Sequence, residues 1–377
     1  MQKAIQEIST IIQRDSKDTT YKFALLKATI EIIQEYDHYI EKKDDQVTIP
    51  LGLVILKWIE YYYPIFDSDY FIPQKKGDKQ QKTLVFRGIF NEVIKHYEKG
   101  LGYLQLNEEL KTGNVNESVK ENLQRLIKKL RETIVKMPMT YIGSAVNKGG
   151  EIFKYNNDSK FKVGLRSELN NLHIIRNCGS FSIPSDYYDA FKLFGSFING
   201  KDSLIMEWLN FTLKADSQNN LNKGEVLSIL DPNFKNDREV ADVQNFYKQI
   251  LNQGDLFCVW SGERIKGNNL NIDHVVPYSL WHNNDLWNLL PTTEKMNNKK
   301  RNKIVHPQLL HNRKELIIFY WESIYQEFPL RFENEIKTSL LGFSNFHSEN
   351  WQDKAFNSLL TKCNFLVSER GLEPFNI

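Results

Sequence analysis

The spacing of apolar residues along the first 250 positions is the feature that most limits how this chain can fold. Apolar side chains recur there at three- and four-residue intervals, as in Phe23, Leu26 and Ile30. This spacing places them on one face of an α-helix, where they can be buried together. The segments with this pattern are 20–42, 50–63, 84–97, 119–137, 185–198 and 203–214. We therefore predict a mainly helical N-terminal region over residues 1–250.

A short stretch inside this region has a different pattern. Two apolar runs, Ile152 to Tyr155 and Leu172 to Ile175, lie close to glycines and are typical of strands. We therefore expect a small β element within residues 139–182.

A domain boundary is predicted near Gly254, where a helical pattern over 240–251 ends. The second domain would span 254–377, with helices expected over 307–328 and 350–367 after its core. The predicted fold class is α+β and predominantly helical.

Charge and cysteine content exclude several classes of protein. The chain has 49 Lys+Arg and 47 Asp+Glu, so a nucleic-acid site has to be local rather than spread over the surface. The cysteines Cys178, Cys258 and Cys363 are too few for a four-cysteine zinc site, and they are too far apart to suggest a disulfide framework.

The sequence indicates a cytoplasmic protein with no membrane partner. Its longest apolar run, residues 49–56, ends at Lys57 and is far shorter than the ~20 residues that span a bilayer. Residues 1–5 are amphipathic and lack the apolar core of a signal peptide.

Residues 256–304 carry the pattern that points to chemistry. An apolar run at 256–260 predicts a strand, and a second strand at 270–272 ends in Asp273-His274. A loop that holds Asn288 follows, and a polar helix is then predicted over 294–301. The surrounding segment, 254–314, has nine Lys+Arg against five Asp+Glu, which favours a local site for a polyanion.

This segment resembles the HNH endonuclease family, whose ββα-metal core carries the active site. The matching residues are Asp273-His274 followed by Val-Val-Pro, Asn288 within Leu-Trp-Asn-Leu, and Asn297 within Asn-Asn-Lys-Lys. Asn288 lies 14 residues after His274, and Asn297 lies nine residues after Asn288. An Asn at the third family position resembles the H-N-N variant found in the HNH domains of RNA-guided CRISPR effectors.

The chemistry of these residue types agrees with the resemblance. A histidine titrates near neutral pH, so His274 can act as the general base that takes a proton from water. Carboxylate and carboxamide oxygens are hard ligands, so Asp273 and Asn297 are expected to bind Mg²⁺, with Mn²⁺ as an alternative ion. The resemblance implies that Asn288 braces the loop that aims His274. Four basic residues are expected to contact the DNA backbone, namely Lys299, Lys300, Arg301 and Lys303.

One departure from the family concerns zinc. Many HNH domains hold a structural zinc with two Cys-x-x-Cys pairs, whose positions here are Cys258, Ser261, Thr293 and Met296. Three of these four are not cysteines, so we expect no structural zinc and a buried Cys258. Apolar packing then has to hold the core, and the candidates for it are Trp260, Trp281 and Trp287.

The sequence therefore predicts a metal-dependent HNH endonuclease that hydrolyses DNA phosphodiester bonds. Stand-alone HNH proteins with extra helical domains resemble bacterial restriction or anti-phage defence nucleases. One ββα site cuts one strand at a time, so double-strand cleavage would need a homodimer or two events. The region 1–250 would offer a surface for a protein partner or an activating ligand.

Three alternatives stay open. The protein can be a nucleic-acid-binding or assembly subunit whose HNH fold does not cut. It can be an RNA nuclease, or an effector that stays silent until a partner activates it.

Overall fold

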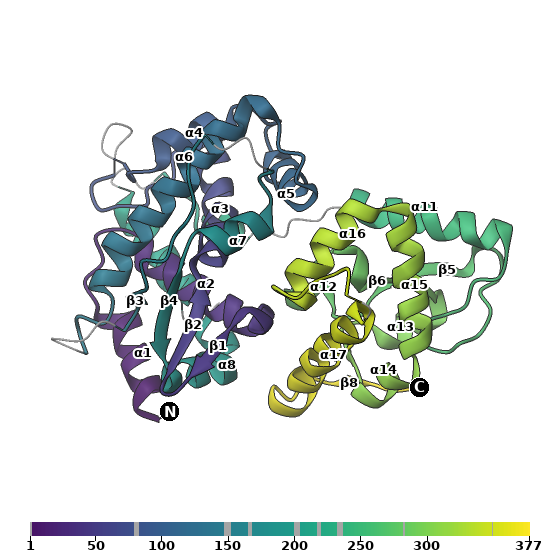
Figure 1. Ribbon diagram of the computed structural model, residues 1–377. Coiled ribbons are helices and arrows are strands. Elements are labelled where there is room, and N and C mark those ends of the chain that lie inside the picture. The colour runs from purple at the N-terminus through teal and green to yellow at the C-terminus, as the bar shows by residue number, and fades with distance from the viewer. Residues whose placement is uncertain are drawn as a thin grey trace. The chain divides into compact units, whose positions relative to one another are not determined.

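The protein folds into two compact units, Met1–Pro232 and Asn233–Ile377, each with its own hydrophobic core. In Figure 1 the first unit runs from purple to teal and the second from green to yellow. The structure, a computed structural model, describes residues 2–78, 83–146, 152–164, 168–199, 204–216, 220–231, 237–281, 283–348 and 350–377. The fold is α+β and predominantly helical, which confirms the predicted class.

The N-terminal unit is built mainly from helices. These are α1 (Gln2–Arg14), α2 (Tyr21–Glu35), α3 (Leu51–Asp67), α4 (Arg87–Ile94), α5 (Gly102–Thr112), α6 (Glu117–Ile134), α7 (Asn171–Asn177), α8 (Ser185–Asn199), α9 (Leu204–Ala215) and α10 (Lys223–Leu230). Helix α2 lies at the centre, because it contacts α3, α8 and α9 and nearly all its side chains are buried. Aromatic rings fill the space beside it, and Trp58 of α3 stacks on Tyr21 of α2 at 5.6 Å between centroids.

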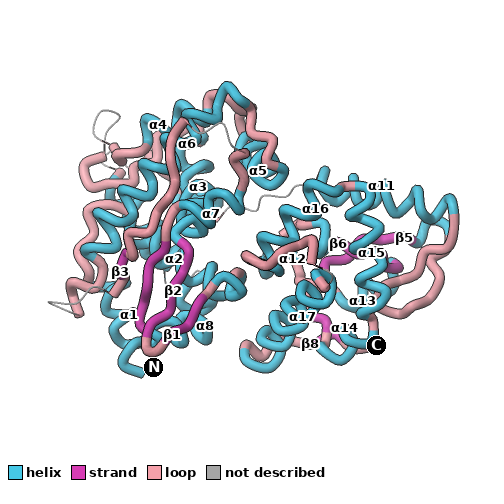
Figure 2. Tube along the Cα trace, in the orientation of Figure 1, coloured by secondary structure: helices cyan, strands magenta, loops and turns pink. Residues whose placement is uncertain are grey.

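A small antiparallel sheet completes this unit (Figure 2, magenta). Its strands lie in the order β1 (Glu41–Lys43), β2 (Gln46–Pro50), β4 (Ser180–Pro184) and β3 (Lys154–Tyr155). The pairs Val47–Ile183 and Ile49–Phe181 are buried on one face, toward α8 and α3.

The strand predicted over residues 172–175 is wrong, because these residues lie in helix α7. The Asn170 side chain accepts a hydrogen bond from the His173 backbone N–H at 2.8 Å and so caps the first turn. Leu172, Ile174 and Ile175 are buried. A helix this short is too brief for its apolar periodicity to be told from that of a buried strand.

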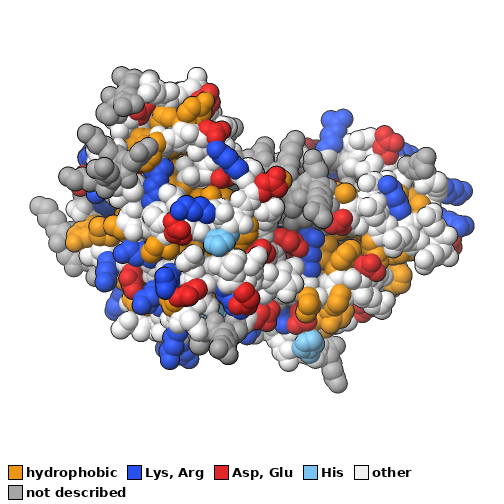
Figure 3. Space-filling model, turned by 90° about the horizontal axis from the view of Figure 1, so that it is seen from above, with side chains coloured by type: hydrophobic (Ala, Val, Ile, Leu, Met, Phe, Trp, Pro, Cys, Tyr) orange, Lys and Arg blue, Asp and Glu red, His pale blue; other side chains and the backbone are white. Residues whose placement is uncertain are grey.

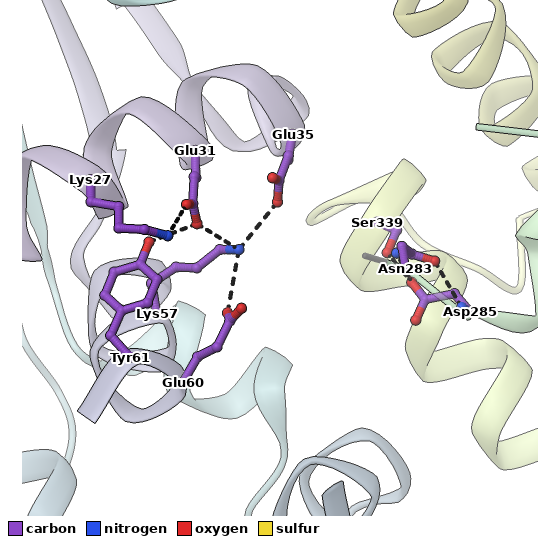
Figure 4. A network of polar contacts seen from close by, with 9 residues as sticks. All are labelled: Lys27, Glu31, Glu35, Lys57, Glu60, Tyr61, Asn283, Asp285 and Ser339. Carbon is purple, nitrogen blue, oxygen red and sulfur yellow. Dashed lines mark hydrogen bonds and ion pairs between the residues drawn. The ribbon is translucent and has the colours of Figure 1, made fainter. Parts of the chain in front are cut away.

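A half-buried polar network joins α2 to α3 (Figure 4). The Lys57 ammonium lies 3.1, 3.3 and 3.4 Å from the carboxylates of Glu31, Glu35 and Glu60. The Tyr61 hydroxyl donates a hydrogen bond to Glu31 at 2.6 Å. One lysine therefore shares its charge among three half-buried acids.

The pKa values of the two α2 acids, Glu31 and Glu35, are shifted in opposite directions. Burial raises the pKa of Glu35 to about 7, because its attraction to Lys57 is offset by its acidic neighbours. Burial acts in the same direction on Glu31, but Lys57 and a second ion pair, to Lys27, outweigh it and hold its pKa well below the ordinary value.

The C-terminal unit contains a β-hairpin surrounded by helices. Its elements are α11 (Asp237–Gln253), β5 (Leu270–His274), α12 (Tyr278–Trp281), β6 (Leu289–Thr293), α13 (Glu294–Lys300), β7 (Ile304–Val305), α14 (Pro307–Asn312), α15 (Lys314–Glu327), α16 (Pro329–Ile336), α17 (Trp351–Asn364) and β8 (Pro374–Phe375). The strands β5 and β6 are antiparallel, and β7 and β8 form a short parallel pair. The indole side chains of Trp260, Trp287 and Trp321 are fully buried in its core.

The first predicted strand of the ββα core, 256–260, is also wrong. Residues 258–263 form a turn closed by a hydrogen bond from the Cys258 N–H to the Glu263 carbonyl at 2.8 Å. Only an isolated bridge, Phe257 to Arg264, is present in this segment. The partner of β5 is β6, whose proline had obscured the strand pattern in the sequence.

Helix α11 belongs to the C-terminal unit. Val243 and Tyr247 are buried in its core, and the helix contacts β5 and β6. The limits expected from the sequence, 1–250 and 254–377, placed these residues in the N-terminal region. Periodicity shows that a helix has an apolar face, but it does not show which core receives that face.

Basic and acidic side chains are interspersed on the face of each unit that Figure 3 shows. This agrees with the nearly balanced charge of the chain. Among the described residues, no helix has both the length and the apolar character that crossing a membrane requires.

Candidate active site

The site predicted from the sequence lies where β5 faces helix α13. Strand β6 leads directly into this helix, and the Thr293 side chain caps it by accepting a hydrogen bond from the Met296 N–H at 3.3 Å. Side chains alternate along β5, so Asn271 and Asp273 point to the same face of the strand. Helix α13 contacts both of them from that face, through Asn297 and Lys300.

Asp273 is a buried carboxylate with both oxygens hydrogen-bonded. It is only 4% exposed, and its Oδ2 accepts a hydrogen bond from the Trp260 indole N–H at 2.6 Å. Its Oδ1 lies 3.2 Å from the Lys300 ammonium. Burial raises the pKa of Asp273, while Lys300 and Trp260 act against that rise.

His274 is half-buried and is held through one ring nitrogen. Its Nε2 lies 2.8 Å from Oδ1 of Asn284, and an amide oxygen only accepts hydrogen bonds. Nε2 therefore carries the proton, and Nδ1 is the basic nitrogen of the neutral ring. Burial lowers the pKa of His274, although Asn284 and Asp273 oppose that effect. The arrangement favours a neutral imidazole at pH 7.

Asn288 is fully buried and binds the backbone that follows His274. Its Oδ1 accepts from the Val276 N–H at 2.8 Å, and its Nδ2 donates to the Val276 carbonyl at 3.0 Å. Its Nδ2 also donates to the carbonyl of Asn283 at 3.1 Å. Its backbone carbonyl accepts from the Val275 N–H at 2.9 Å. These bonds join the two ends of the loop between β5 and β6.

The same loop is anchored to the following helices through Asp285 (Figure 4). The Asp285 carboxylate accepts hydrogen bonds from Asn283 at 2.8 Å, Ser339 at 2.5 Å and the Trp287 indole at 3.1 Å. The next residue, Leu286, donates its N–H to Glu335 of α16 at 2.6 Å. The loop that carries Asn284 is therefore held both by Asn288 and by residues of the helices that follow it in the chain.

The remaining predicted site residues lie on or after α13. Asn297 is half-buried, and its Nδ2 donates to Oδ1 of Asn271 at 3.4 Å. Lys299 and Arg301 are exposed, whereas Lys303 forms an ion pair with Glu373 at 2.5 Å. Asn297 and Lys299 therefore lie on α13, whereas Arg301 and Lys303 follow its C-terminal end.

The position of Lys300 differs from the expectation that it contacts DNA. Its side chain has no exposed surface, and its ammonium also donates to the His274 carbonyl at 2.6 Å. A buried ammonium that is bonded inward does not reach a DNA phosphate, so we do not count Lys300 among the DNA contacts.

Sequence reasoning missed three partners of the site: Trp260, Asn284 and Lys300. Trp260 was expected only to pack, and Lys300 was expected to contact the DNA backbone rather than Asp273. The run Asn283-Asn284-Asp285 was visible only as a polar loop. Asn-rich loops are common, so the signal for Asn284 was its position between Asp273-His274 and Asn288.

The donor set fits a hydrated hard cation. A carboxylate at Asp273 and a carboxamide at Asn297 are oxygen ligands of the kind that Mg²⁺ accepts together with several waters. No cluster of three or more His, Cys, Asp or Glu able to hold a metal occurs within the described part of the chain. The fit therefore rests on one carboxylate and amide oxygens. Cys258 lies at the position of the first zinc-binding cysteine of many HNH domains. It is buried, with its Sγ 3.3 Å from Oγ1 of Thr292.

Two family models match the chain. The model of the HNH endonuclease family matches residues 258–306, which include β5, β6 and α13, so the chain carries an HNH nuclease domain. A second model, described as a domain of unknown function (DUF8808), matches residues 1–230, and the chain belongs to this family. No curated protein and no solved structure matches the chain.

Proposed function

We propose that this protein is a metal-dependent endonuclease that hydrolyses DNA phosphodiester bonds at the β5–α13 site. The observation that carries the proposal is the pair of side chains at the end of β5. There, Asp273, with a buried carboxylate, is followed directly in the chain by His274, whose Nε2 is held by Asn284 at 2.8 Å. Metal-assisted hydrolysis needs both a hard oxygen ligand and an oriented base.

In this proposal His274 is the general base. Nε2 donates to Asn284, so the proton of the attacking water moves to Nδ1. The ring then becomes positively charged, and its hydrogen bond to the Asn284 oxygen strengthens as the charge develops. Asn288 supports the step indirectly by fixing the Val275 and Val276 backbone next to the base.

Asp273 and Asn297 are the residues that we assign to hold the divalent ion, Mg²⁺ or Mn²⁺. When bound, the ion supplies charge neutralisation at the phosphate and acidifies a coordinated water. Lys299 and Arg301 are exposed at the end of α13 and would contact neighbouring DNA phosphates. Lys303 would join them by exchanging its ion pair with Glu373.

The biological role that we propose is bacterial restriction or anti-phage defence in the cytoplasm. The support for it is the combination of an HNH domain with a separate unit of more than 200 residues. That unit would bind an activating ligand or a protein partner. A single site cuts one strand, so a homodimer would be needed for a concerted double-strand break.

The proposal is tested by incubating supercoiled plasmid with the protein in Mg²⁺, in Mn²⁺ and in EDTA. We expect nicking or linearisation with metal and none in EDTA. His274→Ala should lower the rate by about 100-fold or more, because general-base catalysis contributes roughly that much. His311→Ala, at an exposed position of α14, is the matched control and should cut normally. Cleavage that persists in EDTA or in His274→Ala would refute the assignment.

A parallel reaction with labelled single-stranded RNA separates the alternatives. Cleavage of RNA alone would favour an RNA nuclease. Metal-independent binding of DNA without cleavage would favour an assembly subunit. Activity that appears only with an added partner would favour a gated effector.

A further inference from the structure

Lys300 is a buried cation bonded to the carboxylate that we assign to metal binding. Its side chain is 0% exposed, and its Nζ lies 3.2 Å from Oδ1 of Asp273 and 2.6 Å from the His274 carbonyl. A lysine loses its hydration when buried, so it stays charged there only if acceptors surround it. The Lys300 ammonium therefore links the end of α13 to the end of β5 through Oδ1 of Asp273 and the His274 carbonyl oxygen.

The other oxygen of Asp273 is also engaged. The indole N–H of Trp260 donates to Oδ2 at 2.6 Å, and the Lys300 Nζ lies 6.0 Å from the centre of the Trp260 ring. The carboxylate therefore has one positive partner and one neutral partner. Its negative charge is balanced by Lys300 alone among the described cations within ion-pair distance.

A divalent ion and an ammonium compete for this carboxylate. Lys300 already occupies Oδ1 and Trp260 occupies Oδ2, so an entering ion would need an oxygen that is already bonded. Two cations a few ångströms apart would also repel each other strongly where water is excluded. We propose that Lys300 is the counter-ion that a metal must replace, so that loading of the site is a cation exchange at Asp273. This inference rests on the proposed function in taking Asp273 as a metal ligand.

The exchange sets the affinity of the site. Lys300 stabilises the metal-free protein and thereby weakens metal binding by the same free energy, because the ion pair is broken when the ion enters. Removing the charge of Lys300 leaves Asp273 buried without a counter-ion. A metal then binds more tightly, and the metal-free protein is less stable.

The test is Mn²⁺ binding without DNA, measured by calorimetry and by the electron paramagnetic resonance of the free ion. Lys300→Met and Lys300→Gln should each bind Mn²⁺ at least about tenfold more tightly than the wild type. Lys295→Met removes the same charge from an exposed position on α13 and should change the affinity by less than about twofold. Unchanged or weaker binding in both Lys300 variants would overturn the inference.

A second measurement uses the wild type and does not depend on the folding of a variant. Lys300 should resist acetylation in EDTA, and its modification should rise when Mn²⁺ is bound, as followed by mass spectrometry of its peptide. Lys299 in the same region is the internal reference. Bound Mn²⁺ without any rise in Lys300 acetylation would overturn the exchange.

These results separate this inference from the nuclease proposal. Tighter Mn²⁺ binding by the Lys300 variants, with no DNA cleavage by any form, supports the exchange and contradicts a nuclease that acts without a partner. DNA cleavage by the wild type, with equal Mn²⁺ affinities in all forms, would support the nuclease proposal and overturn the cation exchange. Absence of Mn²⁺ binding in every form overturns the exchange. The double variant Asp273→Asn, Lys300→Met should lose the gain in affinity, which assigns it to Asp273.

Discussion

At the scale of single residues, the site depends on partners that complete hydrogen bonds out of contact with water. Both carboxylate oxygens of Asp273, the Nε2 of His274 and the side-chain amide of Asn288 are each bound by defined neighbours. Such contacts restrict each side chain to one orientation, which a reactive group needs more than it needs bulk stability. Asn284 is the partner that holds the His274 ring, so its replacement should have a measurable effect on cleavage.

Replacing Asn284 with Ala should slow DNA cleavage through the chemical step. Without the amide oxygen, the His274 ring loses the bond that fixes its tautomer, so single-turnover rates should fall roughly 10- to 100-fold. The concentration of DNA that gives half the maximal rate should change little, because Asn284 is buried and does not face DNA.

The matched control is Asn298→Ala, at an exposed position on α13. Nitrogen NMR of His274 gives a readout independent of cleavage, since Asn284→Ala should mix the two neutral tautomers. A single Nε2–H tautomer in that variant would contradict the role of Asn284 as the positioning residue.

Glu35 makes the N-terminal unit less stable as the pH rises. Its pKa is about 7 in the folded protein against an ordinary 4.5, so the folded state keeps its proton where the unfolded state has lost it. Stability is therefore lost between pH 4.5 and pH 7 and stays lower above that range. Glu35→Gln should remove this loss and be more stable than wild type at pH 8 by about 2 kcal/mol, with a smaller difference at pH 5.

Urea unfolding of both proteins at pH 5 and pH 8 measures this effect. Glu98→Gln, at an exposed position, is the control and should show no pH-dependent difference. If Glu35→Gln lost stability equally at both pH values, the hydrogen bond to Lys57 would outweigh the burial of the charge.

At the scale of elements, close backbone approach decides which helices can pack together. A Cβ on Gly52 of α3 would lie 2.4 Å from the Ile174 carbonyl oxygen of α7. Helix α7 is thus seated on α3 at a distance that only glycine allows. Gly52 therefore sets how closely α7 packs on α3.

Gly52→Ala should destabilise the N-terminal unit by about 1–3 kcal/mol, because α7 has to shift away from α3. The matched control is Gly88→Ala in α4, where a Cβ would meet nothing within 4 Å. That variant should gain about 0.5–1 kcal/mol from its higher helix propensity. Urea denaturation compares the two, and equal effects would show that the contact at Gly52 is not limiting.

At the scale of the whole molecule, the chain separates a nuclease domain from a unit with a large core of its own. The family model over residues 1–230 ends close to the unit boundary at Pro232. The sequence-based limit lay further along because α11 has the same helical pattern as its predecessors. Tertiary contacts decide that α11 belongs with β5 and β6.

The helical character of the chain and the order of Asp273-His274, Asn288 and Asn297 could be predicted from the amino-acid sequence. Both are local properties: helical periodicity spans a few turns, and the four residues lie within one hairpin and its helix. Only the tertiary structure decided that β6 pairs with β5, that Asn284 holds His274, and that Lys300 lies against Asp273. Each depends on which face of a strand meets which turn of a helix, and a charged residue near a helix end can point either outward or inward. The buried carboxylate settles that choice for Lys300, because its negative charge needs a cation where water is excluded.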